Sequence, residues 1–243
     1  MKTFRYAHRG LHDISQGVPE NSLTAFRRAI GRGFGAELDV HLLADGSLAV
    51  FHDFDLKRMT GREGVVEDLT AEELSEYKLA GTEETIPQLY EVVELFDRAK
   101  LPLIVELKPN RGNHAALAAR TVREMDKYLA PYVMESFDPR CLLWLRRNRP
   151  EIIRGQLAQD FLSGSEVPGL SRVQRRILTH MDFNRATRPN FVAFRFEDRD
   201  TPSLKRVKRF KSAVIFYWTI RSREDMEIAE AEGAQVIFEG FVP

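Results

Sequence analysis

Short apolar runs alternate with longer segments of helical periodicity along most of the chain. The runs predict strands at 3–8, 36–43, 101–107, 132–137, 152–158, 191–196, 213–220 and 235–238. Between them, apolar residues recur at helical spacing. These patterns predict helices from the Asn21-Ser22 cap to about Arg32, and at about 87–100, 113–128, 139–148, 169–181, 201–210 and 222–232. Strands that alternate with helices indicate βαβ units and a parallel sheet.

Eight such strands favour a closed (β/α)8 TIM-type barrel, whose active site would lie at the carboxyl ends of the strands. The alternative is an open, doubly wound sheet. That fold is disfavoured because no glycine-rich phosphate loop follows the first strand. No change of composition marks a linker, so we expect residues 1–243 to form a single catalytic barrel domain.

The second strand is followed by features that break the repeat. Asp45-Gly46 is a tight-turn signal, and Leu48 to Phe51 reads as a short strand returning from it. The resulting hairpin would bring His52 back toward the second strand. Residues 54–86 are polar, with a short amphipathic turn at 71–77. We expect them to form a small insertion over the active-site face.

The end of the pattern leaves one part of the predicted barrel uncovered. The chain stops at Pro243, directly after the eighth strand, so no closing helix follows. We expect the seam between the last and first strands to be covered by a flanking helix or by another subunit, as in a homodimer.

Composition and charge narrow the classes of partner. The 243 residues include 36 Lys and Arg against 36 Asp and Glu, which argues against a nucleic-acid binder. Cys141 is the single cysteine, so no intramolecular disulfide can form, as is usual in a reducing cytoplasm. The start of the chain shows no secretory signal, and no apolar run approaches membrane-spanning length. We expect a cytoplasmic protein without stable membrane insertion.

Acidic residues alternate with leucine in two of the predicted strands. In Glu37-Leu38-Asp39 and Glu106-Leu107-Lys108, the charged side chains therefore project from one face. Buried carboxylates are costly unless a cation neutralises them. As hard oxygen ligands, Glu37, Asp39 and Glu106 suit a divalent metal, Mg²⁺ or Ca²⁺. The alternative is that Glu37 and Glu106 are rim residues in ion pairs, for instance with Arg9 or Lys108.

Two histidines, His8 and His52, fall at strand ends near this acidic group. A histidine pair can supply a general acid and a general base in one cleft. Arg9 and Lys108 add cations that suit a phosphate group. Simple charge balancing would explain these cations but not the histidines. The remaining histidines are read as core or rim residues: His12, His41, His114 and His180.

Several short motifs stand in a recognisable order. They are His8-Arg9-Gly10, Pro19-Glu20-Asn21-Ser22, Glu37-Leu38-Asp39-Val40, Asp45-Gly46, His52-Asp53, Ile86-Pro87 and Glu106-Leu107-Lys108. As a set they resemble the glycerophosphodiester phosphodiesterase family. The likeness is dense over 7–108 and then thins to Ser136-Phe137-Asp138 and Trp218-Thr219.

The resemblance implies a metal-dependent enzyme that cleaves a small-molecule glycerophosphodiester to an alcohol and glycerol 3-phosphate. In such enzymes the glycerol 2-hydroxyl attacks phosphorus, and water then opens the cyclic intermediate. The resemblance assigns the metal to the three carboxylates and the acid–base roles to His8 and His52. It places the other site residues around the substrate: Arg9 and Lys108 on the phosphate, Glu20 and Asn21 shaping the site, and Phe137 and Trp218 on the alcohol side.

The chain departs from this family near its end. Glu239-Gly240 stands where relatives often have Thr-Asp, and Arg221 replaces a polar amide. Both changes affect the far wall of the pocket, so the choice of alcohol is open. Two other functions remain in view: a lysophospholipase D-like phosphodiesterase and a non-catalytic barrel that binds phosphodiesters. The basic run at 205–211 is read as a solvated helix face, and Cys141 as a core residue.

Overall fold

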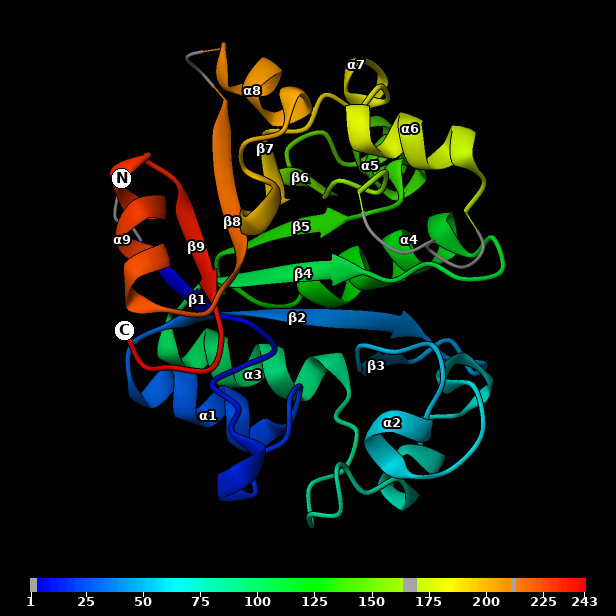
Figure 1. The fold of residues 1–243 in the computed structure, drawn as a ribbon. Helices are drawn as coiled ribbons and strands as arrows, with labels where there is room; N and C mark the ends of the chain where they lie inside the picture. Colours follow the sequence, from blue (N-terminus) through cyan, green and yellow to red (C-terminus); the bar gives the residue numbers. More distant parts are fainter. Residues whose placement is uncertain (1–3, 164–169, 211–212) are drawn as a thin grey trace.

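Eight parallel strands form a closed barrel, because the first strand pairs with both the second and the last. The computed structural model describes residues 4–163, 170–210 and 213–243, and within them the strands run in barrel order (Figure 1). They are β1 Arg5–Ala7, β2 Gly35–Leu42, β4 Leu103–Leu107, β5 Tyr132–Ser136, β6 Arg154–Ala158, β7 Phe191–Arg195, β8 Val214–Ile220 and β9 Gln235–Phe238. The predicted barrel is confirmed, and the open sheet is wrong.

Helices connect successive strands as the periodicity predicts. They are α1 Leu23–Gly31, α3 Leu89–Ala99, α4 His114–Met125, α5 Pro139–Asn148, α6 Arg172–His180, α8 Pro202–Lys208 and α9 Arg223–Ala231. A further short helix, α7 Asn184–Thr187, precedes β7 and was not predicted. Three residues of the predicted segments, Thr3, Gly169 and Lys211, lie outside the described residues.

Alternation along β2 sorts its side chains between the barrel interior and the helical layer. Leu38 and Val40 are fully buried and belong to the apolar cluster that contains Phe26 of α1 and Phe96 of α3. Glu37 and Asp39, at the alternate positions, therefore face the interior. Ser22 starts α1 by accepting a hydrogen bond from the Ala25 N–H, as the predicted cap requires.

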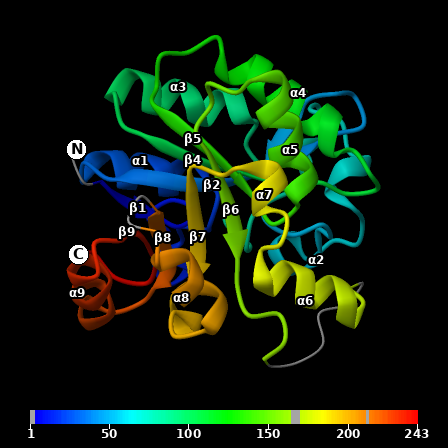
Figure 2. The same ribbon diagram turned by 90° about the horizontal axis from the view of Figure 1, so that it is seen from above.

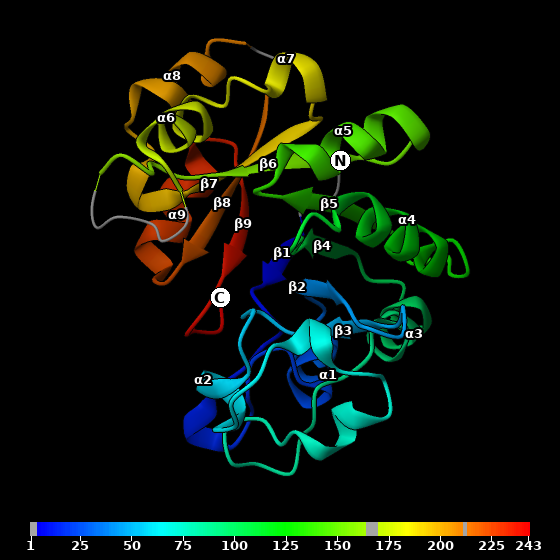
Figure 3. The same cartoon turned by 90° about the vertical axis from the view of Figure 1, so that its right-hand side faces the viewer.

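The predicted hairpin is present: β3 Leu48–Val50 lies antiparallel to β2, with Val40 opposite Val50. Residues 54–86 then form α2 Lys57–Thr60 and two 3₁₀ turns, Val66–Asp68 and Glu73–Glu76. Figure 3 shows α2 and this segment on the side of the molecule away from α6. Although polar overall, the segment buries its own apolar cluster, which is centred on Leu56, Val66, Leu74 and Ile86.

Flanking helices cover the seam between β9 and β1. Phe238 of β9 is 1% exposed, and its ring packs edge-on against Phe34 and Phe241, with centroids 5.0 and 5.7 Å apart. Ala29 of α1 and Ala229 of α9 belong to the same cluster. The burial of the seam therefore requires no second subunit.

An apolar layer fills the barrel beneath its charged end. It contains Tyr6, Ile104, Leu157, Ala193 and Ile237, which come from five different strands. Three of the charged residues described below, His8, Glu106 and Glu239, lie two positions after Tyr6, Ile104 and Ile237 respectively. None of the helices in the described part of the chain is long and apolar enough to cross a membrane.

Candidate active site

Three carboxylates meet inside the carboxyl end of the barrel. Asp39 and Glu106 are register partners on β2 and β4, and Glu37 precedes Asp39 on the same strand face. One oxygen from each residue lies within 4.8 Å of the other two. All three residues are at most 7% exposed, so they are interior groups rather than rim residues.

Burial sets the electrostatics of this acidic cluster. It raises the pKa of Glu37 well above its usual value, and the neighbouring Asp39 and Glu106 add to the effect. Burial also raises the pKa of Glu106, against the effect of Lys108. Asp39 differs, because Lys108 and His52 outweigh its burial and lower its pKa well below the usual value. The charged form of all three carboxylates together would therefore need more positive charge nearby than the side chains of the described residues supply.

The two predicted cations lie against this cluster. The Lys108 Nζ is 3.3 Å from Asp39 Oδ1 and 3.1 Å from Glu106 Oε1. The Arg9 Nε is 3.5 Å from Asp39 Oδ2. The ion pairs considered as an alternative do exist, but two cations face three buried carboxylates. The donor set, all hard oxygens with a net negative charge, fits a divalent metal ion.

Left-handed backbone at the β1–α1 connection aims other groups at the carboxylates. Arg9 and Asn21 have φ of 52° and 54°, which is uncommon outside glycine. The Arg9 N–H donates to Glu37 Oε2 at 3.1 Å, and the Asn21 amide donates to Asp39 Oδ2 at 2.9 Å. Gly10 is also left-handed, and a Cβ there would lie 2.8 Å from that of Ala25. Backbone strain of this kind clusters at functional sites.

A carboxylate that the sequence analysis did not select holds His8. The His8 Nδ1 lies 2.5 Å from Glu239 Oε2, and its Nε2 lies 3.9 Å from Glu37 Oε2. Burial lowers the pKa of His8, although the bond to Glu239 opposes this. Burial would raise the pKa of Glu239, but His8 lowers it to about 2. The departure noted at Glu239-Gly240 therefore brings a carboxylate into the site.

His52 is held in a similar way from the other side. Its Nδ1 lies 2.6 Å from Asp53 Oδ1. Arg58 of α2 donates to Asp53 Oδ2 at 2.5 Å and to Glu20 Oε1 at 2.7 Å. Glu20 in turn accepts a hydrogen bond from Arg9 at 2.8 Å. Arg58 was not predicted as a site residue, and no pattern within residues 54–86 could have singled it out.

Two aromatic residues lie on a different wall of the barrel end. Phe137 follows β5, Trp218 lies on β8, and their rings meet edge-to-face with centroids 5.7 Å apart. The Trp218 Nε1–H is buried without a hydrogen-bond partner in the described structure. An indole donor placed in this way can bind an oxygen of a bound molecule.

Glu135 of β5 is a fourth buried acid that the sequence analysis missed. It is the register partner of Glu106 and is 1% exposed. Burial, followed by Glu106 and Asp39, raises its pKa well above the usual value. The same strand parity that selected Glu106 could have found it, since it falls two positions before Phe137 in the predicted strand at 132–137.

Residues that the sequence assigned to the core or to a solvated surface, such as His41, Cys141 and the basic run, make contacts outside the acidic cluster. His41 shares the interior parity of Asp39, but its Nδ1 lies 3.3 Å from Glu67 Oε1 and its Nε2 3.4 Å from the His52 carbonyl oxygen. Cys141 is fully buried on α5. In the basic run, Lys205 pairs with Asp200 and Lys208 with Glu232.

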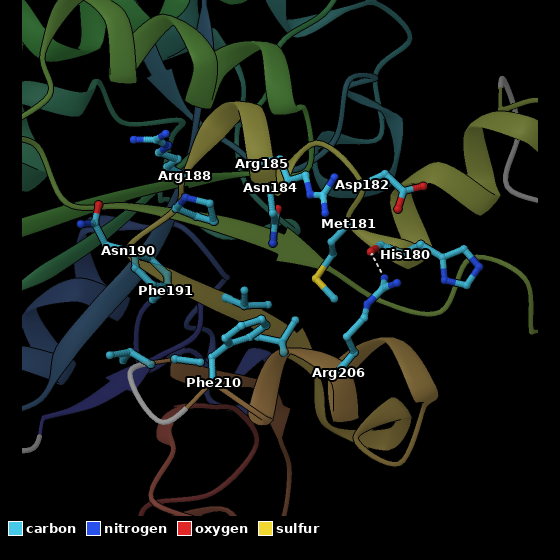
Figure 4. Close-up of a pocket in the computed structure, with 15 residues that line it drawn as sticks. His180, Met181, Asp182, Asn184, Arg185, Arg188, Asn190, Phe191, Arg206 and Phe210 are labelled. Atoms are coloured by element: carbon cyan, nitrogen blue, oxygen red, sulfur yellow. Dashed lines mark hydrogen bonds between the residues drawn. The ribbon is translucent and has the colours of Figure 1, made fainter.

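A separate hollow of about 660 Å³ lies between α7 and α8 (Figure 4). Arg185, Phe210 and Arg206 line it, and Arg206 donates a hydrogen bond to the His180 carbonyl oxygen at 2.7 Å. Phe191 and Val214, the first residues of β7 and β8, also line it. The hollow thus lies at the amino ends of the strands and is not part of the acidic site.

This fold and site define a class: a (β/α)8 barrel with a buried acidic cluster that could hold a divalent metal ion, flanked by two histidines and two cations. Comparison with known proteins gives the family. Residues 8–241 match the glycerophosphoryl diester phosphodiesterase family. The chain belongs to this family, as its motifs predict.

Individual relatives are consistent with membership of this family. A glycerophosphodiester phosphodiesterase from Caldanaerobacter subterraneus is 32% identical, over 93% of this chain and 89% of the relative. A solved glycerophosphodiester phosphodiesterase from Thermotoga maritima is 26% identical, with a TM-score of 0.73 over 98% of this chain and 95% of that one. An Oleispira antarctica phosphodiesterase, solved with its product sn-glycerol-3-phosphate, is 24% identical. It shares the fold at a TM-score of 0.79 over 97% and 92% of the two chains.

Proposed function

We propose that the chain hydrolyses glycerophosphodiesters to an alcohol and glycerol 3-phosphate with the help of a divalent metal ion. The observation that carries the proposal is the buried cluster of Glu37, Asp39 and Glu106, with His8 3.9 Å from Glu37. The cluster's three acids exceed its two cations, and each histidine is already held by a carboxylate. Family membership supports the same activity.

The carboxylates Glu37, Asp39 and Glu106 would hold Mg²⁺ or Ca²⁺. Such an ion would neutralise charge on the phosphate and make phosphorus more electrophilic. Arg9 and Lys108 would bind the remaining phosphate oxygens, and their contacts with Asp39 support this role. Glu20 and Asn21 would fix Arg9 and Asp39, to which they are hydrogen-bonded.

The two histidines would move the protons. Glu239 and Asp53 each engage Nδ1, which leaves Nε2 of both rings for the substrate. One histidine would accept the proton of the glycerol 2-hydroxyl as it attacks phosphorus, and the other would protonate the departing alcohol. Water would then open the cyclic phosphate with the roles reversed. Phe137 and Trp218 would flank the alcohol.

The proposal extends to the domain and its location. We infer that residues 1–243 act as one barrel domain and that 54–86 is an insertion over its active-site face. The contacts of Arg58 with Asp53 and Glu20 support this. A cytoplasmic location is supported by the lone, buried Cys141.

The test measures glycerol 3-phosphate release from glycerophosphocholine, glycerophosphoethanolamine and glycerophosphoglycerol. The protein is first treated with a chelator, and Mg²⁺ or Ca²⁺ is then restored. Release that depends on the ion is expected. Undiminished release without any ion would contradict the metal role. Binding of all three diesters without hydrolysis would instead indicate a non-catalytic barrel.

A further inference from the structure

An apolar groove of about 460 Å³ lies beside the candidate active site, with Phe137 in its lining, and is bordered by the start of α5 and by α6. Its apolar lining consists of Phe137, Phe161, Leu170, Ile177, Leu178 and Phe183. Figure 2 shows α7 close to α5, while α6 lies farther out, beyond β6. The groove is thus lined by Phe137 directly after β5, by Pro139 and Arg140 at the start of α5, and by Gln174, Ile177 and Leu178 of α6.

The charged groups at the groove are already paired with each other. Arg140 and Asp138 form an ion pair at 2.6 Å at the start of α5. The Gln174 side-chain oxygen accepts a hydrogen bond from the Ser171 N–H at the start of α6. With these groups paired, the described lining of the groove presents mainly carbon to a ligand.

Phe137 makes the groove continuous with the candidate active site. Its ring meets Trp218 on one side and Phe161 on the other, with centroids 5.7 and 5.8 Å apart. Gln156 fixes the backbone here by donating to the Phe137 carbonyl oxygen at 3.3 Å. A substituent that leaves the reaction centre on the Trp218 side would pass Phe137 and enter the groove.

The far end of the groove exposes apolar surface that the fold does not bury. Phe183, which lines it, is 45% exposed, and Leu162, which follows the lining residue Phe161 in the chain, is 44% exposed. Exposed apolar surface at a groove can mark a binding site. Because Phe137 both lines the groove and contacts Trp218 of the candidate active site, the occupant is best explained as part of the substrate.

We propose that the groove binds an aliphatic chain carried by the alcohol of the substrate. This inference rests on the proposed function, since the phosphodiester bond cleaved is the same. It names the substrate class as glycerophosphodiesters of long-chain alcohols. The glycerol moiety keeps its free 2-hydroxyl, so the chain requires no change in the chemistry.

The experiment compares glycerophosphoethanol with glycerophosphobutanol and glycerophosphooctanol, each below the concentration at which it self-associates. Glycerol 3-phosphate release gives kcat/KM for each. Burial of one methylene can contribute about fourfold, so we expect at least a tenfold rise from ethyl to octyl. Phe183→Asp and Ile177→Ser should remove most of this rise and leave glycerophosphoethanol unaffected. Val173→Asp is the matched control, because Val173 lies on α6, is 68% exposed and does not line the groove.

Each outcome separates the two proposals. Equal kcat/KM for all chain lengths would overturn the groove assignment and leave the proposed function intact. Hydrolysis of none of the diesters would overturn the proposed function itself. A rise that persists in both groove variants would place the chain elsewhere. A groove-dependent gain for lysophosphatidylcholine alone, measured against glycerophosphocholine by choline release, would assign the groove to a chain on the glycerol and overturn the alcohol assignment.

Discussion

The Nδ1 of His8 lies 2.5 Å from Oε2 of Glu239, so the ends of the first and last strands are joined by a charged hydrogen bond. The bond orients the ring and leaves Nε2 toward the carboxylates. It gives Glu239 a positioning role, since the residue acts through His8. Two predictions depend on this pair.

Glu239→Gln should lower kcat/KM by about 10- to 100-fold, the usual range for a lost orienting partner. Glu239 raises the pKa of His8 against burial. Its loss should therefore shift to lower pH the limb of the pH–rate profile that His8 governs. Glu197→Gln is the control. Like Glu239, Glu197 is a carboxylate near Arg221, at 3.5 Å, but in the described structure it has no contact with His8. A uniform loss of rate with an unmoved profile would indicate a purely structural role.

The same pair should contribute to acid stability. Glu239 has an ordinary pKa of 4.5 when unfolded, and His8 lowers it to about 2 in the folded protein. A carboxyl whose pKa is lowered by folding stabilises the protein above its unfolded pKa, and this contribution is lost as the pH falls through its folded pKa. Between pH 4.5 and 2, denaturant unfolding should thus show a smaller loss of stability for Glu239→Gln than for the native chain. Parallel curves for the two proteins would contradict this.

His8→Ala and His52→Ala should each lower kcat by about 10²- to 10⁴-fold, because each removes a proton-transfer group. Circular dichroism and thermal unfolding should show that both variants fold. His180→Ala, at a histidine beside the separate hollow, provides the control. Near-native turnover of either active-site variant would exclude that histidine from the acid–base pair.

Arg58→Ala should lower kcat/KM roughly tenfold, because it removes the guanidinium that donates hydrogen bonds to both Asp53 and Glu20. Part of this loss should be recovered in Arg58→Lys, which keeps the charge but not the fork of donors. The control is Arg62→Ala in the same segment, where the side chain is 52% exposed and bonds only outside the site. If Arg58→Ala behaves like Arg62→Ala, the insertion does not support the histidine.

Mg²⁺ or Ca²⁺ should raise the melting temperature of chelator-treated protein. An ion at 100 times its Kd stabilises by about 2.7 kcal/mol, which for a domain of this size is a shift of roughly 5–10 °C. Glu37→Gln should abolish the shift but remain folded without the ion, since glutamine is close to glutamate in size and burial already disfavours the charged form of Glu37 by raising its pKa. Glu67→Gln, a buried acid bonded to His41 instead, should keep the shift. A shift retained in Glu37→Gln would place the ion elsewhere.

Local pattern was sufficient to predict the barrel and much of the site. Alternation along β2 and β4 placed Glu37, Asp39 and Glu106 on interior faces, because strand parity is a property of neighbouring residues. Parallel strands also bring their carboxyl ends to one edge, so strand-end residues such as His8 could be grouped without coordinates.

Unlike Glu135, which strand parity could have found, Glu239 and Arg58 depend on contacts between distant segments. Glu239 meets His8 across 231 residues, and Arg58 meets Glu20 across 38. Neither has a periodic position that marks it in the sequence. The groove could not be foreseen either, because its lining comes from segments that are separate in the sequence, with Phe161 after β6 and Ile177 on α6.

The closure of β1 on β9 also has a consequence for the order in which the protein is made. His8 is synthesised with the first strand, while its partner Glu239 follows the last, 231 residues later. A nascent chain could assemble the carboxylate cluster after β4, yet the His8 ring would have no anchor until β9 emerged. The reaction centre is thus completed only after β9 and Glu239 have been made.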